Sequence, residues 1–176
     1  MNEKDKRVLL SLARNTIAKS LGLPYQEIDA SEFNKKKGAF VTLKKNNQLR
    51  GCIGYIFPIK PLNQAIIDLS LEASYEDPRF QSVTKEEFSD INIEISVLTE
   101  PMLINNLNEF ELYRDGIILS LNYHKAVFLP QVAMETGWTK DQLLEALSQK
   151  AGLVPQAYKR ADVQFMTFQA EVFHEM

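Results

Sequence analysis

The stretch "KKGAFVTLKKNNQLRGCIGYIF", residues 36–57, decides the fold because it has the pattern of a β-hairpin. Two runs rich in β-branched and aromatic residues flank Asn46-Asn47, and asparagine tolerates the positive φ of a tight hairpin turn. Pro58 and Pro61 end the second run. Since a tight turn joins antiparallel neighbours, this stretch predicts an antiparallel sheet.

Helical patterns lie on both sides of the hairpin. Residues 4–21 carry apolar side chains at spacings of three and four, and Gly22 follows where a helix cap is expected. Residues 61–75 repeat this spacing. The second helix must end near "EDPRF", residues 76–80, because a proline disfavours helical backbone in the residue before it.

Further strands follow along the chain. Residues 90–100 alternate apolar and polar side chains, residues 116–130 predict a second hairpin turning near Asn122-Tyr123, and residues 163–173 predict one long final strand. Short helices are expected between the second hairpin and the final strand. Because hairpins outnumber strand–helix–strand units, the sequence predicts an α+β fold with a largely antiparallel sheet and flanking helices.

Composition narrows the classes of function. The 176 residues carry a net charge of −3, which disfavours a dedicated nucleic-acid binder. A single cysteine excludes an intrachain disulfide, and no signal peptide or bilayer-spanning run is present, so we expect a cytoplasmic protein. The two histidines belong to no metal-binding spacing, and no nucleotide or cofactor fingerprint occurs. The sequence therefore predicts neither a metal nor a cofactor, although a carboxylate-rich site for a hard cation stays open.

Cys52 is the first candidate for chemistry. With a two-residue turn, Val41 lies opposite Cys52 and Leu43 lies opposite Arg50, and Arg50 shares the face of the cysteine. A nearby guanidinium lowers the pKa of a thiol and makes it reactive. The alternative is a packed, inert cysteine, because free cysteine is among the most buried residue types.

The glycines beside Cys52 have two interpretations of their own. Gly51 and Gly54 remove side-chain bulk on both faces of the strand, which suits the close approach of a ligand or of another backbone. A β-bulge or a crossing helix would require the same residues. The residues alone leave these alternatives open.

Three other positions complete the candidate site. Asp77 and Arg79 flank a turn-forming proline and either contact a polar substrate or form a structural ion pair. Glu94 interrupts an apolar strand, where a partly buried carboxylate could transfer protons; a solvated strand face is the alternative. Gln131 lies at a strand-to-helix junction, where backbone amides can bind anions; capping or chain geometry is the alternative.

Taken in order, four blocks of the chain resemble the AMMECR domain, over about residues 8–174. They are "GAFVTLKKNNQLRGCIGYI" (38–56), "DPRFQSVTKEE" (77–87), "INIEISVLTEP" (91–101) and "FLPQVAMETGWTKDQLLEALSQKAGL" (128–153). The resemblance implies one AMMECR-type domain over residues 1–176. Within it we expect a larger subdomain from both ends of the chain and a smaller one at roughly 58–90.

The resemblance implies no particular reaction. It points to the LRGCIG segment, and together with the residues themselves it suggests an enzyme or an essential enzyme partner. Cys52 would be the nucleophile or a thiol ligand, Arg50 its activator and anion clamp, and Glu94 the proton-transfer group. Gly51, Gly54, Asp77, Arg79 and Gln131 would bind substrate. Prokaryotic members are labelled AmmeMemoRadiSam system protein A, which implies Memo-like and radical S-adenosylmethionine proteins as partners. A non-catalytic interaction module is the alternative, and nucleic-acid binding is a weaker one.

Overall fold

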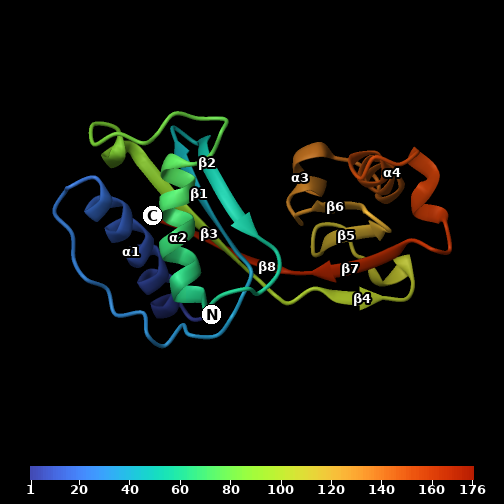
Figure 1. The fold of residues 1–176 in the computed structure, drawn as a ribbon, viewed down its shortest axis with the longest axis horizontal. Coiled ribbons are helices and arrows are strands. Elements are labelled where there is room, and N and C mark those ends of the chain that lie inside the picture. The colour runs from blue at the N-terminus through green and yellow to red at the C-terminus, as the bar shows by residue number, and fades with distance from the viewer. The chain divides into compact units, whose positions relative to one another are not determined.

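The computed structural model describes all residues, 1–176, and the chain forms two compact units (Figure 1). The first unit comprises Met1–Leu98 together with Glu171–Met176, and the second comprises Thr99–Ala170. Each unit contains its own four-stranded sheet. The α+β class with antiparallel sheets is therefore confirmed, whereas the division of the strands between two sheets was not predicted.

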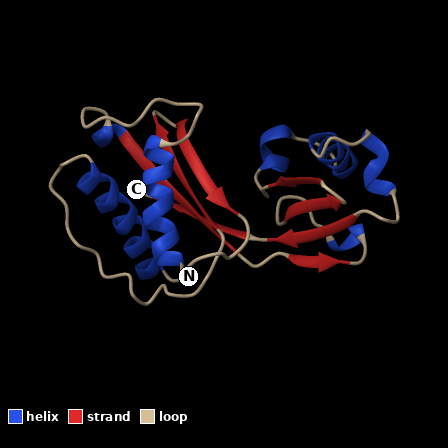
Figure 2. Cartoon of the chain, in the orientation of Figure 1, coloured by secondary structure: helices blue, strands red, loops and turns tan.

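The first unit is a sheet with both of its long helices on one face (Figure 2). The strand order is β2-β1-β3-β8. The elements are α1 (Glu3–Ser20), β1 (Ala39–Lys45), β2 (Gln48–Tyr55), α2 (Leu62–Tyr75), β3 (Ile91–Leu98) and β8 (Ala170–His174). These bounds match the predicted helices and hairpin closely, because each is marked by a local signal such as Gly22 or Pro61.

The second unit has the strand order β4-β7-β5-β6. Its elements are β4 (Met102–Ile104), β5 (Gly116–Leu121), β6 (His124–Phe128), α3 (Val132–Thr136), α4 (Lys140–Lys150) and β7 (Gln164–Phe168). Asn122 has a φ of 53°, as the predicted hairpin turn requires. The side chains of Thr139 and Gln142 cap the start of α4 reciprocally.

Alternation along β1 separates a buried face from an outward face. Ala39, Val41 and Leu43 are fully buried beneath the helices. Side chains alternate along a strand, so Thr42 and Lys44 lie on the face that the helices leave uncovered. This outward face carries the polar positions of β1 and of its two neighbours.

A β-bulge at Arg50 corrects the predicted register of the hairpin. Next to the turn, Lys44 pairs with Leu49 as expected. Arg50 is then left without a partner residue, so Leu43 pairs with Gly51, and Thr42 pairs with Cys52. The predicted pairs of Val41 with Cys52 and Leu43 with Arg50 are wrong by one residue, because a bulge inserts one residue into one strand only.

The two glycines of the LRGCIG segment are used for packing. A Cβ atom on Gly51 would lie 2.3 Å from the carbonyl oxygen of Ala73, so α2 crosses β2 in close contact. A Cβ atom on Gly54 would lie 2.3 Å from the ring of Phe40 on β1. The structure thus shows the crossing helix of the second interpretation at Gly51, with a β-bulge beside it, and the close approach of a neighbouring strand at Gly54.

The division into units also differs from the expectation. Residues 58–90 belong to the first unit, because α2 packs on α1 and on β1 there. The predicted long strand 163–173 is interrupted at Gln169 and contributes β7 to one sheet and β8 to the other. At this crossing the N–H of Gln169 donates to the Oγ1 of Thr99, and the N–H of Thr99 donates to the carbonyl of Gln169.

None of the helices combines the length and the apolar composition that crossing a membrane requires.

Candidate functional site

A row of three polar side chains crosses the outward face of the first sheet. Thr42 on β1 pairs with Cys52 on β2 and with Glu94 on β3. All three alternate with residues that face the helices. We call Cys52, Thr42 and Glu94 the outer-face row. It unites two of the three predicted catalytic residues and adds a threonine between them.

The thiol of Cys52 is held in its protonated form. Its Sγ lies 3.1 Å from the Oγ1 of Thr42. Burial raises the pKa of the Cys52 thiol, and the negative charges of Asp77 and Glu94 add to this effect. The hydroxyl of Thr42 and the charge of Arg79 act in the opposite direction without overcoming burial. At neutral pH the group is a weak hydrogen-bonding thiol, not a thiolate.

Asp77 fixes the 77–80 turn against the edge strand β2. Its carboxylate is 2% exposed and accepts hydrogen bonds from the backbone N–H of Cys52 at 2.9 Å and from the N–H of Arg79 at 3.1 Å. The guanidinium of Arg79 adds bonds of 3.0 and 2.8 Å. This guanidinium, together with the backbone donors, holds the pKa of the Asp77 carboxyl far below its usual range. Asp77 therefore binds protein groups and has little capacity left for substrate.

Arg50 serves a different partner from the one predicted. Its Nε donates to Glu87 Oε1 at 2.6 Å, and its guanidinium lies 6.0 Å from the centre of the Phe80 ring. Its Nη1 is buried without a hydrogen-bond partner. The expectation that Arg50 activates Cys52 is wrong, because Arg79 is the cation that acts on the thiol and burial raises the thiol pKa.

Glu94 is paired with a cation in the outward face. Its Oε2 lies 2.7 Å from the Nζ of Lys44, with the two side chains 17% and 37% exposed. Both line a polar cavity of about 380 Å³, together with the Asn46–Asn47 turn and His174. The outer-face row thus continues into a hollow of amide and charged groups. The lining contains one lysine, Lys44, and three carboxylates, those of Asp90, Glu94 and Glu175. Together with the asparagine amides, these groups suit recognition by hydrogen bonds of a partner that supplies donors.

Gln131 belongs to a different unit from the outer-face row. It lies in the second unit, where it precedes α3 and its carbonyl accepts the N–H of Glu135. No group of three or more His, Cys, Asp or Glu side chains is arranged to hold a metal ion.

Sequence reasoning missed three residues of this region. Thr42 contacts the thiol, Lys44 pairs with Glu94, and Glu87 pairs with Arg50. The alternation of β1 could have placed Thr42 and Lys44 on the outward face. The partner of Arg50 could not have been found, because the glycines allowed a β-bulge without fixing its position at Arg50, and Glu87 lies 37 residues farther along the chain.

Comparison with known proteins gives consistent matches over nearly the whole chain. The family model described as AMMECR1 matches residues 10–173. A protein of Methanothermobacter thermautotrophicus is 38% identical and covers 99% of this chain and 96% of its own. Protein MJ0810 of Methanocaldococcus jannaschii is 39% identical over 82% of this chain and 76% of its own.

One solved structure is similar in fold and in sequence. The crystal structure of the uncharacterized protein PH0010 from Pyrococcus horikoshii matches with a TM-score of 0.85 and 33% identity. The match covers 99% of this chain and 93% of that one. Both units described above are therefore included in the similarity.

Proposed function

Because this chain belongs to the AMMECR1 family, we propose that it works as the non-catalytic partner of an enzyme and binds that enzyme through the outer-face row. One observation carries the proposal: the partly buried Cys52 thiol has the hydroxyl of Thr42 as its hydrogen-bond partner at 3.1 Å, and burial raises its pKa, so the residue best placed to act as a nucleophile is not activated. The AmmeMemoRadiSam label suggests a Memo-like or a radical S-adenosylmethionine protein as the enzyme.

The charges around the row support recognition over catalysis. Arg50 is paired with Glu87, Arg79 with Asp77 and Lys44 with Glu94. A general acid or base needs a carboxylate that is available to a substrate. A docking surface instead needs fixed donors and acceptors, which these pairs and the 380 Å³ cavity provide.

Alkylation of the thiol distinguishes a partner from a covalent enzyme. Cys52 is the only cysteine, so labelling by iodoacetamide reports on it alone. Because its pKa is raised, we expect the labelling rate to rise only above the range of a free thiol, about pH 8.5. The measurement is the rate of mass increase against pH, with glutathione as the reference. A rate that already levels off near pH 7 would contradict the proposal and favour a catalytic nucleophile.

Co-purification tests the docking surface directly. The wild-type chain is expected to form a complex with a Memo-like or a radical S-adenosylmethionine protein from the same organism. Changing Lys44→Gln and Glu94→Gln together removes a charge pair without leaving a lone charge. We expect complex formation to weaken about tenfold, as for a hot-spot pair.

The matched control is Lys60→Gln with Asp68→Asn. The Nζ of Lys60 lies 2.6 Å from the Oδ2 of Asp68 on helix α2. This distance and the exposure of the two side chains are similar to those of the Lys44–Glu94 pair. The control should bind the partner as the wild type does. Absence of a complex with both candidate proteins, or equal weakening by both double variants, would refute the docking role of the row.

A further inference from the structure

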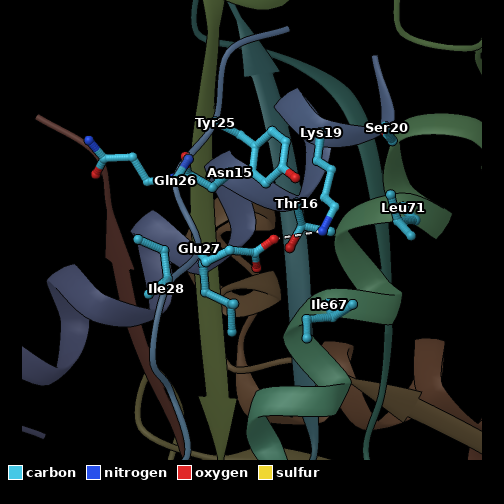
Figure 3. Close-up of a pocket in the computed structure, with 11 residues that line it drawn as sticks. Asn15, Thr16, Lys19, Ser20, Tyr25, Gln26, Glu27, Ile28, Ile67 and Leu71 are labelled. Atoms are coloured by element: carbon cyan, nitrogen blue, oxygen red, sulfur yellow. Dashed lines mark hydrogen bonds and ion pairs between the residues drawn. The ribbon is translucent and has the colours of Figure 1, made fainter. Parts of the chain in front are cut away.

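A second cavity, of about 340 Å³, lies on the helical side of the first unit (Figure 3). One stripe of α1, two residues of α2 and the segment 25–28 line it. Segment 25–28 belongs to the connection between α1 and β1, residues 21–38, which contains no helix or strand. Connections of that length without regular structure are uncommon and often form binding loops.

The floor of this cavity is apolar. Leu12 contributes from α1, Ile28 from the connection, and Ile67 and Leu71 from successive turns of α2. Ile28, Ile67 and Leu71 are only half-buried. An apolar group placed against them would therefore remove more apolar surface from water, at about 25 cal/mol per Å².

The wall formed by the connection is fixed in place. The backbone N–H of Gln26 donates to the Oδ1 of Asn15 on α1 at 2.7 Å. Farther along, the backbone N–H of Asn63 at the start of α2 donates to the carbonyl of Phe33. The connection is thus tied to both helices, and the cavity is formed before any ligand binds.

Two opposite charges meet at the rim. The Nζ of Lys19 lies 2.7 Å from the Oε1 of Glu27, as the dashed line in Figure 3 shows. The same ammonium lies 4.8 Å from the centre of the Tyr25 ring. The rim therefore contains a cation that can bind a carboxylate. The carboxylate of Glu27 and the Tyr25 ring, both of which now contact the Lys19 ammonium, suit an ammonium group.

We propose that this cavity binds a free α-amino acid with an aliphatic or aromatic side chain. The side chain packs on the apolar floor. The ligand carboxylate pairs with Lys19, and the ligand ammonium pairs with Glu27 over the ring of Tyr25. A zwitterion exchanges one ion pair for two, whereas a ligand with one charge would leave Lys19 or Glu27 unpaired. The volume suits a small ligand of this kind.

The proposal concerns the helical face and does not depend on the outer-face row. Titration of the full chain with L-leucine or L-phenylalanine, followed by amide NMR shifts, tests it. We expect saturable shifts at Thr16, Gln26 and Ile67, with a Kd of about 1 mM or tighter. Glycine, 3-methylbutan-1-amine and 4-methylpentanoate, which lack the side chain, the carboxylate and the ammonium respectively, should each bind at least about tenfold more weakly.

Variants at the rim complete the test. Lys19→Gln with Glu27→Gln should weaken L-leucine binding at least about tenfold, and Arg160→Gln with Asp162→Asn, a similarly exposed pair, should leave it unchanged. Absence of saturable shifts at about 10 mM ligand would overturn the proposal. So would equal binding of glycine or of either single-charge analogue, or equal binding by the rim variant.

Discussion

The variant Asp77→Asn is expected to lose about 3 kcal/mol of unfolding free energy at pH 7. The wild-type carboxylate accepts four hydrogen bonds from Cys52 and Arg79 in a site that is 2% exposed. Asparagine keeps the shape but loses the charge, and its amide nitrogen faces donors instead of acceptors. Urea denaturation of both proteins measures the difference.

The same variant should flatten the acid limb of the stability curve. The folded-state pKa of Asp77 lies far below its value in the unfolded chain. Its contribution is therefore complete above the unfolded pKa of about 3.9 and is lost as the pH falls towards the folded pKa. The difference in stability between wild type and variant should shrink between about pH 5 and pH 2.

An exposed pair of the same geometry provides the control. Arg160 donates from Nε and Nη2 to the two carboxylate oxygens of Asp162, with both side chains more than half exposed. Asp162→Asn should change the unfolding free energy by less than about 1 kcal/mol. If Asp77→Asn has an equally small effect, or a pH-independent one, Asp77 does not lock the turn onto β2.

The second large effect is expected for Gly51→Ala. A single methyl group there would lie 2.3 Å from the carbonyl oxygen of Ala73, and backbone cannot move aside as a flexible side chain can. Helix α2 must shift away from β2, which we expect to destabilise the chain by about 3 kcal/mol. Thermal or urea unfolding measures the loss.

The neighbouring change Cys52→Ala serves as the reference for Gly51→Ala. It lies in the same strand but on the outward face, away from α2. Its effect should stay within about 1 kcal/mol. Equal effects of the two substitutions would show that the contact of β2 with α2 does not require a glycine.

Much of the candidate site was predictable because it lies in strands with strong alternation. The pattern of β3 places Glu94 opposite the buried isoleucines, and the Asn46–Asn47 turn places the hairpin. Arg50 was misassigned because one bulged residue changes the pairing beyond it. The direction of the Arg50 side chain therefore depends on a β-bulge at that one residue.

The electrostatic state of the site was not predictable. The sequence places Arg50 two residues from Cys52, which suggested a lowered thiol pKa. In the folded chain, burial outweighs the nearby cation and raises that pKa. Part of this environment comes from the 77–80 turn, which lies farther along the chain and is bound to Cys52 through Asp77.

By itself the sequence determined the helices, both hairpins and the α+β class, because caps, turns and alternation are local properties of neighbouring residues. Only the tertiary structure decided the register beyond Arg50, the partners of Asp77 and Glu94, and the interruption at Gln169 that gives two sheets. These features depend on contacts between segments far apart in the chain. The conformational preferences of neighbouring residues carry no information about such contacts.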